Sequence, residues 1–207
     1  MRPGSAVRKL TDWTLDHLPL LGPKVDGREK RVLEYASNPP LNAVSVYTDG
    51  SALGNPGPAG AGVIIRGLEG GEWRLSLPLG HSDNNTAEMA ALDEGFKKVR
   101  ALEIAGRLTT RAIALFFTDS AGCLGYICRG WKTQVAKKLA RATRAGWSRL
   151  KDRSKALLYW IRGHVGIQGN EDADGEAKAA AKGSQGGAVR GDGWRWIPLP
   201  DQPGAPT

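Results

Sequence analysis

Apolar and polar residues alternate from Val44 to Thr48, and this two-residue period predicts a strand with one buried face. The stretch GNPGPAG (54–60) that follows combines the glycine and proline residues of a turn. Two further strand-like segments come next, AGVIIRG (61–67) and EWRLSLPL (72–79). This part of the chain is therefore predicted to form a meander of three strands.

A helical period replaces the strand period after SDNNTAE (82–88), a stretch rich in residues that cap helices. The apolar residues at helical spacing are Met89, Leu92, Phe96 and Val99. The continuous apolar run RAIALFFTD (111–119) is typical of a central buried strand. A short helix is predicted from Ser120, and a longer one with a basic outer face over about 133–151. The residues expected on its inner face are Val135, Leu139, Ala142 and Leu150.

The regular part of the chain is predicted to close with the strand ALLYWIRG (156–163) and the alanine-rich helix NEDADGEAKAAAK (170–182). Asn170 is the predicted cap of this helix, and His164 lies in the loop before it. The predicted order is three strands, a helix, a strand, two helices, a strand and a helix. This order predicts a mixed sheet with helices on its faces.

The two ends of the chain lack such patterns. Residues 1–41 have no sustained period and are interpreted as an N-terminal linker or arm. Residues 183–207 are dominated by glycine and proline, which predicts a disordered tail. The predicted domain therefore covers residues 42–182.

The composition indicates what kind of partner the protein binds and where in the cell it acts. The chain of 207 residues has a formal net charge of +8, which suggests a polyanionic partner, most simply nucleic acid, although a solubilising surface gives the same signal. Cys123 and Cys128 fit no zinc pattern and are interpreted as reduced core thiols of an intracellular protein, nuclear or cytoplasmic. No apolar run approaches the roughly 20 residues of a membrane helix, so no membrane partner is expected.

Four acids are placed to meet at one end of the predicted sheet. Asp49 ends the first predicted strand, Asp119 ends the fourth, and Glu88 and Asp174 lie on the helices beside them. Carboxylates about 4 Å apart repel each other by roughly 1 kcal/mol in water and about 4 kcal/mol at a protein surface, so such a cluster needs a cation. Oxygen ligands without histidine or cysteine favour Mg²⁺ or Mn²⁺, and two such ions can clamp the attacking and leaving oxygens of a phosphodiester.

The sequence also resembles a known family. Four blocks, YTDGSALGNPGPAGAG (47–62), NNTAEMAAL (84–92), FTDS (117–120) and WIRGHVGIQGNEDADGEAKAAA (160–181), are similar to the signature blocks of ribonuclease H type 1. The last block most resembles the ribonuclease H domains of non-LTR retrotransposons. The resemblance implies an α/β ribonuclease H-like fold, a five-stranded mixed sheet with helices on both faces. It also implies an endonuclease that cuts the RNA strand of an RNA·DNA hybrid with two Mg²⁺ ions, or Mn²⁺ in their place.

The resemblance assigns roles to individual residues. It implies that Asp49, Glu88, Asp119 and Asp174 bind the metal ions and that His164 is a mobile catalytic histidine. It implies contacts to the hybrid from Gly50, Ser51, Asn55, Asn84 and Asn85. The segment between Asp119 and His164 is too short for the full basic protrusion of the bacterial enzyme. The residues expected to substitute for it are Trp131, Lys132, Lys137, Lys138, Arg141 and Arg144.

The sequence departs from the family at two positions near the site. Ala121 follows TDS where glutamine is common, which puts one base contact in doubt. Asp83 precedes the two asparagines where a small hydroxyl residue often helps to hold a DNA phosphate.

Simpler interpretations stay open for each feature. A single acid at a strand end is usually a turn former, His164 alone would be a surface or core histidine, and the asparagines could simply cap the helix. A catalytically silent module that binds hybrids, or a DNA-strand-transfer enzyme of the same superfold, are the alternative functions. The protein is expected to be a monomer, with a possible upstream reverse transcriptase in a retroelement polyprotein.

Overall fold

The computed structural model describes residues 28–68, 70–108, 112–133, 136–153, 155–184 and 193–198. Within these residues the helices and strands, in chain order, are α1 (Arg28–Ser37), β1 (Ala43–Ala52), β2 (Gly57–Leu68), β3 (Gly71–Ser82), α2 (Asn84–Ile104), β4 (Ile113–Thr118), α3 (Ala121–Cys128), α4 (Lys137–Arg153), β5 (Lys155–Trp160), α5 (Gln168–Gly183) and β6 (Trp194–Pro198). None of these helices is both long and apolar enough to cross a membrane.

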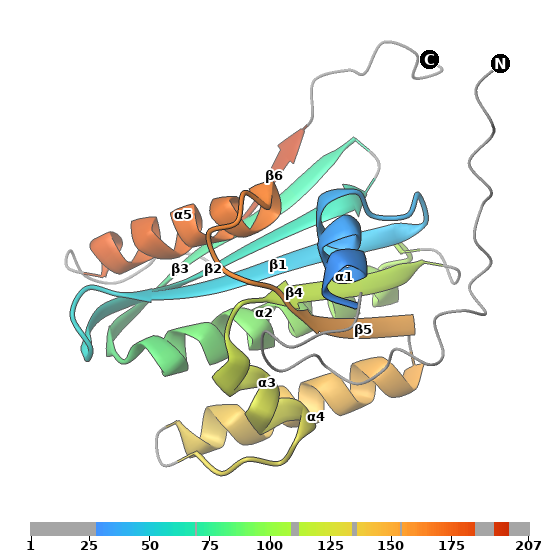
Figure 1. Cartoon of the computed structure of the whole chain (residues 1–207). Coiled ribbons are helices and arrows are strands. Elements are labelled where there is room, and N and C mark those ends of the chain that lie inside the picture. Colours follow the sequence, from blue (N-terminus) through green and yellow to red (C-terminus); the bar gives the residue numbers. More distant parts are fainter. Residues whose placement is uncertain are drawn as a thin grey trace, which may run out of the picture.

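The described strands form one sheet in the order β5-β4-β1-β2-β3-β6 (Figure 1). Strand β4 runs parallel to its neighbours β1 and β5, whereas β1, β2, β3 and β6 are joined by antiparallel pairs. Every residue of β4 is buried, as its continuous apolar run predicts. The predicted meander, the central strand and the mixed sheet are confirmed.

Helices cover both faces of this sheet, with α2, α3 and α4 on one side and α1 and α5 on the other (Figure 1). On the first face, the ring of Phe96 packs edge-on against Phe116 at 4.9 Å and lies 5.3 Å from Trp147 of α4. On the second face, Tyr47 stacks on Phe117 at 5.2 Å. The four apolar positions predicted for α2 are all buried, which confirms its periodicity.

Helix α1 lies inside the segment that the sequence analysis interprets as a linker or arm. Val32 and Ala36, one turn apart, are buried against the second face of the sheet. The hydroxyl of Tyr47 in β1 donates a hydrogen bond to the carbonyl of Ala36 at 2.7 Å. A single turn of apolar residues gives too weak a period to predict a helix from the sequence. The stability of such a helix comes mostly from tertiary packing, which the sequence pattern does not show.

The C-terminal segment also differs from its prediction. Trp194–Pro198 is a sixth strand, β6, so the predicted disorder is wrong for these residues and the sheet has one strand more than predicted. Strand β6 pairs with the edge strand β3, and Trp196 lies 5.3 Å from Trp73. A glycine- and proline-rich composition does not reveal this pairing, because the partner strand lies more than 100 residues earlier in the chain. Residues 185–192 and 199–207 of the predicted tail lie outside the described part of the chain.

Two smaller expectations on the second half of the chain also need correction. In α4, Ala142 faces solvent and Thr143 is buried instead, while Leu150 is buried as predicted and Val135 lies outside the described residues. Both cysteines are free, but only Cys123 is a core residue, since Cys128 is exposed.

Candidate active site

The parallel pairing of β1 with β4 brings the first two acids together. Thr48 and Thr118 are the last partners in this ladder, so the residues that follow them, Asp49 and Asp119, lie side by side. Asp119 follows the end of β4, as predicted. Asp49 does not end β1, because the strand continues to Ala52 through its antiparallel pairing with β2.

The third acid comes from α2, which crosses β1 at very close range. A Cβ atom on Gly50 would lie only 2.1 Å from the backbone nitrogen of Glu88, so the approach of the helix requires glycine at this position. Carboxylate oxygens of Asp49, Glu88 and Asp119 all lie within 4.8 Å of one another. Three of the four predicted acids therefore form one buried or half-buried cluster.

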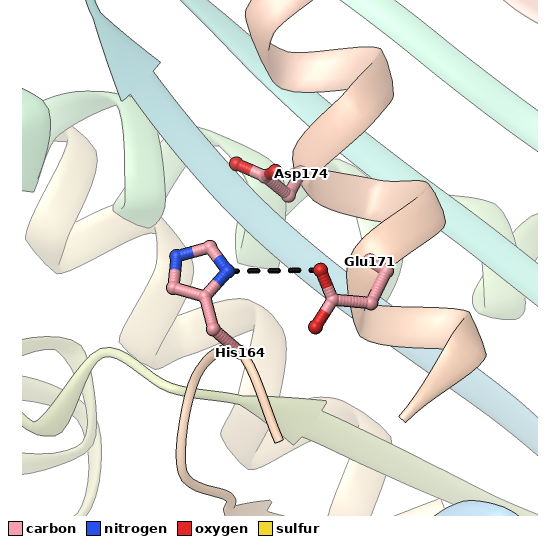
Figure 2. A group of neighbouring side chains, drawn as sticks. All are labelled: His164, Glu171 and Asp174. Atoms are coloured by element: carbon pink, nitrogen blue, oxygen red, sulfur yellow. Dashed lines mark ion pairs between the residues drawn. The ribbon is translucent and has the colours of Figure 1, made fainter. Parts of the chain in front are cut away.

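The fourth acid, Asp174, lies beside this cluster on α5. Its carboxylate lies close enough to Asp49 to raise the pKa of that carboxyl. It also forms an ion pair with Lys178 at 2.6 Å. An oxygen of Asp174 also lies within 4.8 Å of ligand atoms of His164 and Glu171 (Figure 2). The structure thus brings all four acids to one end of the sheet, in two neighbouring groups that approach each other at Asp49 and Asp174.

The buried carboxylates are costly to ionise together. Burial, followed by repulsion from Asp119 and Asp174, raises the pKa of Asp49 to about 8. Burial and the charges of Asp49 and Asp119 raise the pKa of Glu88 well above its usual range. Hydrogen bonds from the backbone of Gly50 to both carboxylates oppose these shifts only in part. The cluster therefore favours a bound cation, which would neutralise its charges.

Two residues that the sequence analysis did not assign to the site hold Asp119. Asn170 lies inside α5, is almost fully buried and donates a side-chain hydrogen bond that lowers the pKa of Asp119, although burial raises it overall. The prediction that Asn170 caps the helix is wrong, because α5 begins at Gln168 with Ile167 at the cap position. Gly163 lies against the same carboxylate, since a Cβ atom there would come within 2.4 Å of Asp119 Oδ2.

His164 projects from the loop between β5 and α5, as predicted. Its side chain is 69% exposed, and its Nδ1 lies 3.6 Å from Glu171 Oε2 (Figure 2). Its φ of +55° is in the left-handed region, next to glycines that adopt such backbone easily. A side chain this exposed is not part of the core. His164 also lies near enough to Asp119 to lower the pKa of that carboxyl, which suits a residue that handles protons.

The N-terminus of α2 carries the predicted hybrid-binding asparagines. Asp83 caps the helix by accepting from the backbone nitrogen of Thr86 at 2.9 Å, so neither asparagine is needed as the cap. The backbone nitrogen of Asn84 donates to Asn55 Oδ1 at 3.1 Å, which ties the β1–β2 turn to the helix. The Asn85 side chain is exposed. Gly50 and Ser51, also predicted to contact the hybrid, lie on the adjoining end of β1.

The predicted basic surface forms a hollow between α3 and α4. Its volume is about 430 Å³, and its lining is basic and aromatic. The residues that line it include Tyr126, Trp131, Lys132, Lys137, Arg141 and Arg144. Lys138 is exposed on the same helix, outside the lining. Because Trp131 is 52% exposed, the hollow presents an aromatic face among positive charges.

The donor set of the acid cluster fits a hard divalent cation. The ligand atoms that Asp49, Glu88 and Asp119 offer are all carboxylate oxygens, which Mg²⁺ and Mn²⁺ prefer. Glu88 Oε2 is buried without a hydrogen-bond partner within the described residues, as expected for an oxygen left for an ion. Fold and site together define an α/β protein with a cluster of carboxylates suited to a cation at one end of its sheet.

Comparisons with known proteins identify the family. The RNase H family profile matches residues 41–182. Ribonuclease H of Maricaulis maris (strain MCS10) is 34% identical over 156 residues, which are 70% of this chain and 99% of that protein. Ribonuclease H of Pseudomonas entomophila (strain L48) is 34% identical over 139 residues, 64% of this chain and 89% of that protein. The chain belongs to the RNase H family.

Solved structures support the same fold. LC11-RNase H1, isolated from compost by a metagenomic approach, matches with a TM-score of 0.56 at 23% identity, covering 70% of this chain and 99% of that one. The same enzyme in complex with an RNA/DNA hybrid matches with a TM-score of 0.52, again at 23% identity, covering 69% of this chain and 99% of that one. The predicted ribonuclease H-like fold is confirmed.

Proposed function

We propose that this protein hydrolyses the RNA strand of RNA·DNA hybrids. The observation that carries the proposal is the buried group of Asp49, Glu88 and Asp119, with Asp174 beside it, in a chain of the RNase H family. LC11-RNase H1, which shares this fold, has been solved in complex with an RNA/DNA hybrid, in keeping with this choice of substrate. Contacts to successive 2′-hydroxyl groups would select RNA as the strand to be cut.

Within this proposal, Asp49, Glu88, Asp119 and Asp174 hold two Mg²⁺ ions, with Mn²⁺ able to replace them. Bound cations of this kind supply a nucleophile at neutral pH and stabilise negative charge on the departing 3′ oxygen. The chain's own residues prepare the site: Asn170 donates to Asp119 and Gly163 packs against its carboxylate. His164, exposed at the edge of the site, moves a proton during turnover or product release.

The substrate-binding residues are proposed on the same grounds. The turn at Asn55 and the start of α2 at Asn84 and Asn85 present polar groups beside the acids, suited to the hybrid backbone. The basic hollow around Trp131 and Arg141 suits the phosphates of the complementary strand. An aromatic face among cations also suits base or sugar stacking.

A retroelement origin remains part of the proposal. It rests on the block GHVGIQGNEDAD (163–174), which most resembles retrotransposon domains, whereas the relatives named above are bacterial enzymes. An upstream reverse transcriptase, a monomeric state and an intracellular site of action are further expectations from the sequence.

A cleavage assay tests the function. The full chain is incubated with an RNA·DNA hybrid, an RNA duplex and a DNA duplex of one sequence, each with Mg²⁺ or with EDTA. We expect Mg²⁺-dependent cuts in the RNA of the hybrid alone, which leave 5′-phosphate and 3′-hydroxyl ends. Tight binding of the hybrid without any cut would instead support the catalytically silent module, and DNA joining would support strand transfer.

A further inference from the structure

Helix α5, which carries Asp174, rests on the sheet through a strip of very small residues. A Cβ atom on Gly62 of β2 would come within 2.0 Å of the carbonyl oxygen of Ala173, and one on Gly60 within 2.4 Å of the Cβ of Ala180. The helix therefore lies unusually close to β2. Such a contact has few interlocking side chains, so it does not by itself stop the helix from rolling about its axis.

One flank of α5 is held by a network of ion pairs with the sheet. Arg66 of β2 bridges Glu72 of β3, with Nε 2.6 Å from Oε2, and Asp172 of α5. Arg74 of β3 also pairs with Glu72 and lies 3.5 Å from Asp172 Oδ2. Glu72 is buried, and both arginines contact its carboxylate.

The C-terminal strand joins the same network. Arg195 of β6 contacts both carboxylate oxygens of Glu176 on α5, at 2.7 and 2.6 Å. Arg74 lies 3.8 Å from Glu176 as well. Both contacts come from one guanidinium nitrogen of Arg195, Nη2, which lies between the two carboxylate oxygens. Strand β6 therefore does more than cover the edge of β3, since it also contacts the helix that carries Asp174.

The network and the metal-binding acid lie on opposite flanks of the helix. Asp172 and Glu176, one turn apart, face β3 and β6, whereas Asp174 faces Asp49 on β1. A roll of about 20° would move a carboxylate about 6 Å from the helix axis by about 2 Å. A displacement of about 1 Å at a catalytic group can cost about 100-fold in rate.

We propose that this ion-pair network, which comprises Arg66, Glu72, Arg74, Asp172, Glu176 and Arg195, sets the roll of α5 and so positions Asp174 in the site. Asp172 is its central positioning residue, and β6 is part of the catalytic unit although it lies beyond the matched family region. The inference rests on the proposed function only in taking Asp174 as a metal ligand.

Asp172→Asn tests the proposal in the full chain, because it keeps the shape and removes the charge that both arginines contact. Thermal melting at increasing Mg²⁺ reports metal binding without any substrate. We expect the Mg²⁺ concentration needed for a fixed rise in melting temperature to increase about 10-fold, in line with the removal of a group that orients a metal ligand. Cleavage should lose kcat by about 10-fold while KM for the hybrid stays within about 2-fold.

Three further variants separate positioning from general stability. Asp172→Glu keeps the charge and should recover most of the Mg²⁺ response, and Arg195→Gln should weaken it in the same direction but less, because Glu176 retains Arg74. Leu102→Ala, at a buried position near the far end of α2, should melt lower without changing the Mg²⁺ concentration needed for the same rise in melting temperature.

An unchanged Mg²⁺ requirement for the same rise in melting temperature in Asp172→Asn, or an equal change in Leu102→Ala, would overturn the positioning role. If Asp172→Asn does not fold, Arg195→Gln decides the question by the same readout. A wild-type chain that neither responds to Mg²⁺ nor cuts the hybrid would mean that the proposed function itself has failed, an outcome visible before any variant is compared.

Discussion

Gly163 lies directly against the carboxylate of Asp119, so closely that a Cβ atom there would come within 2.4 Å of Oδ2. Gly163 follows the end of β5, and Asp119 follows the end of β4, its parallel neighbour in the sheet. The absence of a side chain at position 163 thus leaves room for the carboxylate of Asp119 at the end of the adjacent strand.

Replacing Gly163 by alanine should therefore displace Asp119. We expect Gly163→Ala to lower kcat by about 100-fold, because an ångström-scale shift of a catalytic group has effects of that size. Gly175→Ala is the matched control, since a Cβ atom at that helical position meets nothing within 4 Å. It should leave activity unchanged and raise stability by about 0.5–1 kcal/mol. Equal activity in the two variants would show that Asp119 tolerates the displacement.

Asn170 should control how readily Asp119 accepts a metal ion as the pH falls. Its hydrogen bond lowers the pKa of Asp119, so Asn170→Ala should let that pKa rise further. Because metal ions compete with protons for carboxylates, the variant should need more Mg²⁺ than wild type, and the gap should widen toward about pH 6. Mg²⁺ titrations of single-turnover cleavage at several pH values measure this. Asn38→Ala, at an exposed asparagine, provides the control, and a pH-independent gap would argue against the assigned role.

The acid cluster should make the metal-free protein less stable as pH rises. The pKa of Asp49 is raised from 3.8 to about 8, so this group favours the fold most below its unfolded pKa and loses that contribution as pH rises through the folded value. Each pKa unit corresponds to about 1.4 kcal/mol, a large share of a total stability of about 5–15 kcal/mol.

Asp49→Asn should therefore melt higher than wild type near pH 8 in EDTA and gain less from Mg²⁺. Melting curves from about pH 4 to pH 9, with and without Mg²⁺, measure both effects. Glu94→Gln removes a carboxylate that pairs with Lys97 on α2, and it should show neither change. A wild-type melting temperature that rises with pH across this range would contradict the raised pKa.

The basic hollow should bind phosphates of the hybrid. Replacing Lys137 and Arg141 by alanine should weaken hybrid binding and reduce the log–log salt slope by about 0.7–0.9 for each phosphate that the protein no longer neutralises. The control replaces two exposed basic residues outside the hollow, Arg107 and Lys155. Binding measured at several salt concentrations tests this, and equal slopes in the two double variants would make the hollow an ordinary solvated surface.

The acids of the site were easier to predict than the residues around them. Asp49 and Asp119 could be paired from the sequence because carboxylates at the ends of apolar strands meet wherever those strands are neighbours. Gly163, Asn170 and Glu171 carry no such local signal, because their importance comes from residues that the fold brings to them. Asn170 looked like a helix cap because asparagine favours that position, but α5 begins two residues earlier and carries it into the core.

Helix α1 and strand β6 were not predicted, for a related reason. Helix α1 is held by the buried contacts of Val32 and Ala36, and β6 by its ladder to β3 and by Arg195, all of which are tertiary interactions. A pattern read along the chain detects elements with a strong period of their own. It does not detect short elements whose stability comes from distant partners.

Single-turnover cleavage of an RNA·DNA hybrid by the wild type and by Asp119→Asn, with hybrid binding measured on the same samples, tests the central claim most directly. The amide keeps the shape of Asp119 but removes the charge on which the acid cluster depends. We expect Mg²⁺-dependent cleavage by the wild type, and in the variant no detectable cleavage with binding retained or tighter. Near-normal cleavage by Asp119→Asn would contradict the assignment of the four acids as the catalytic centre.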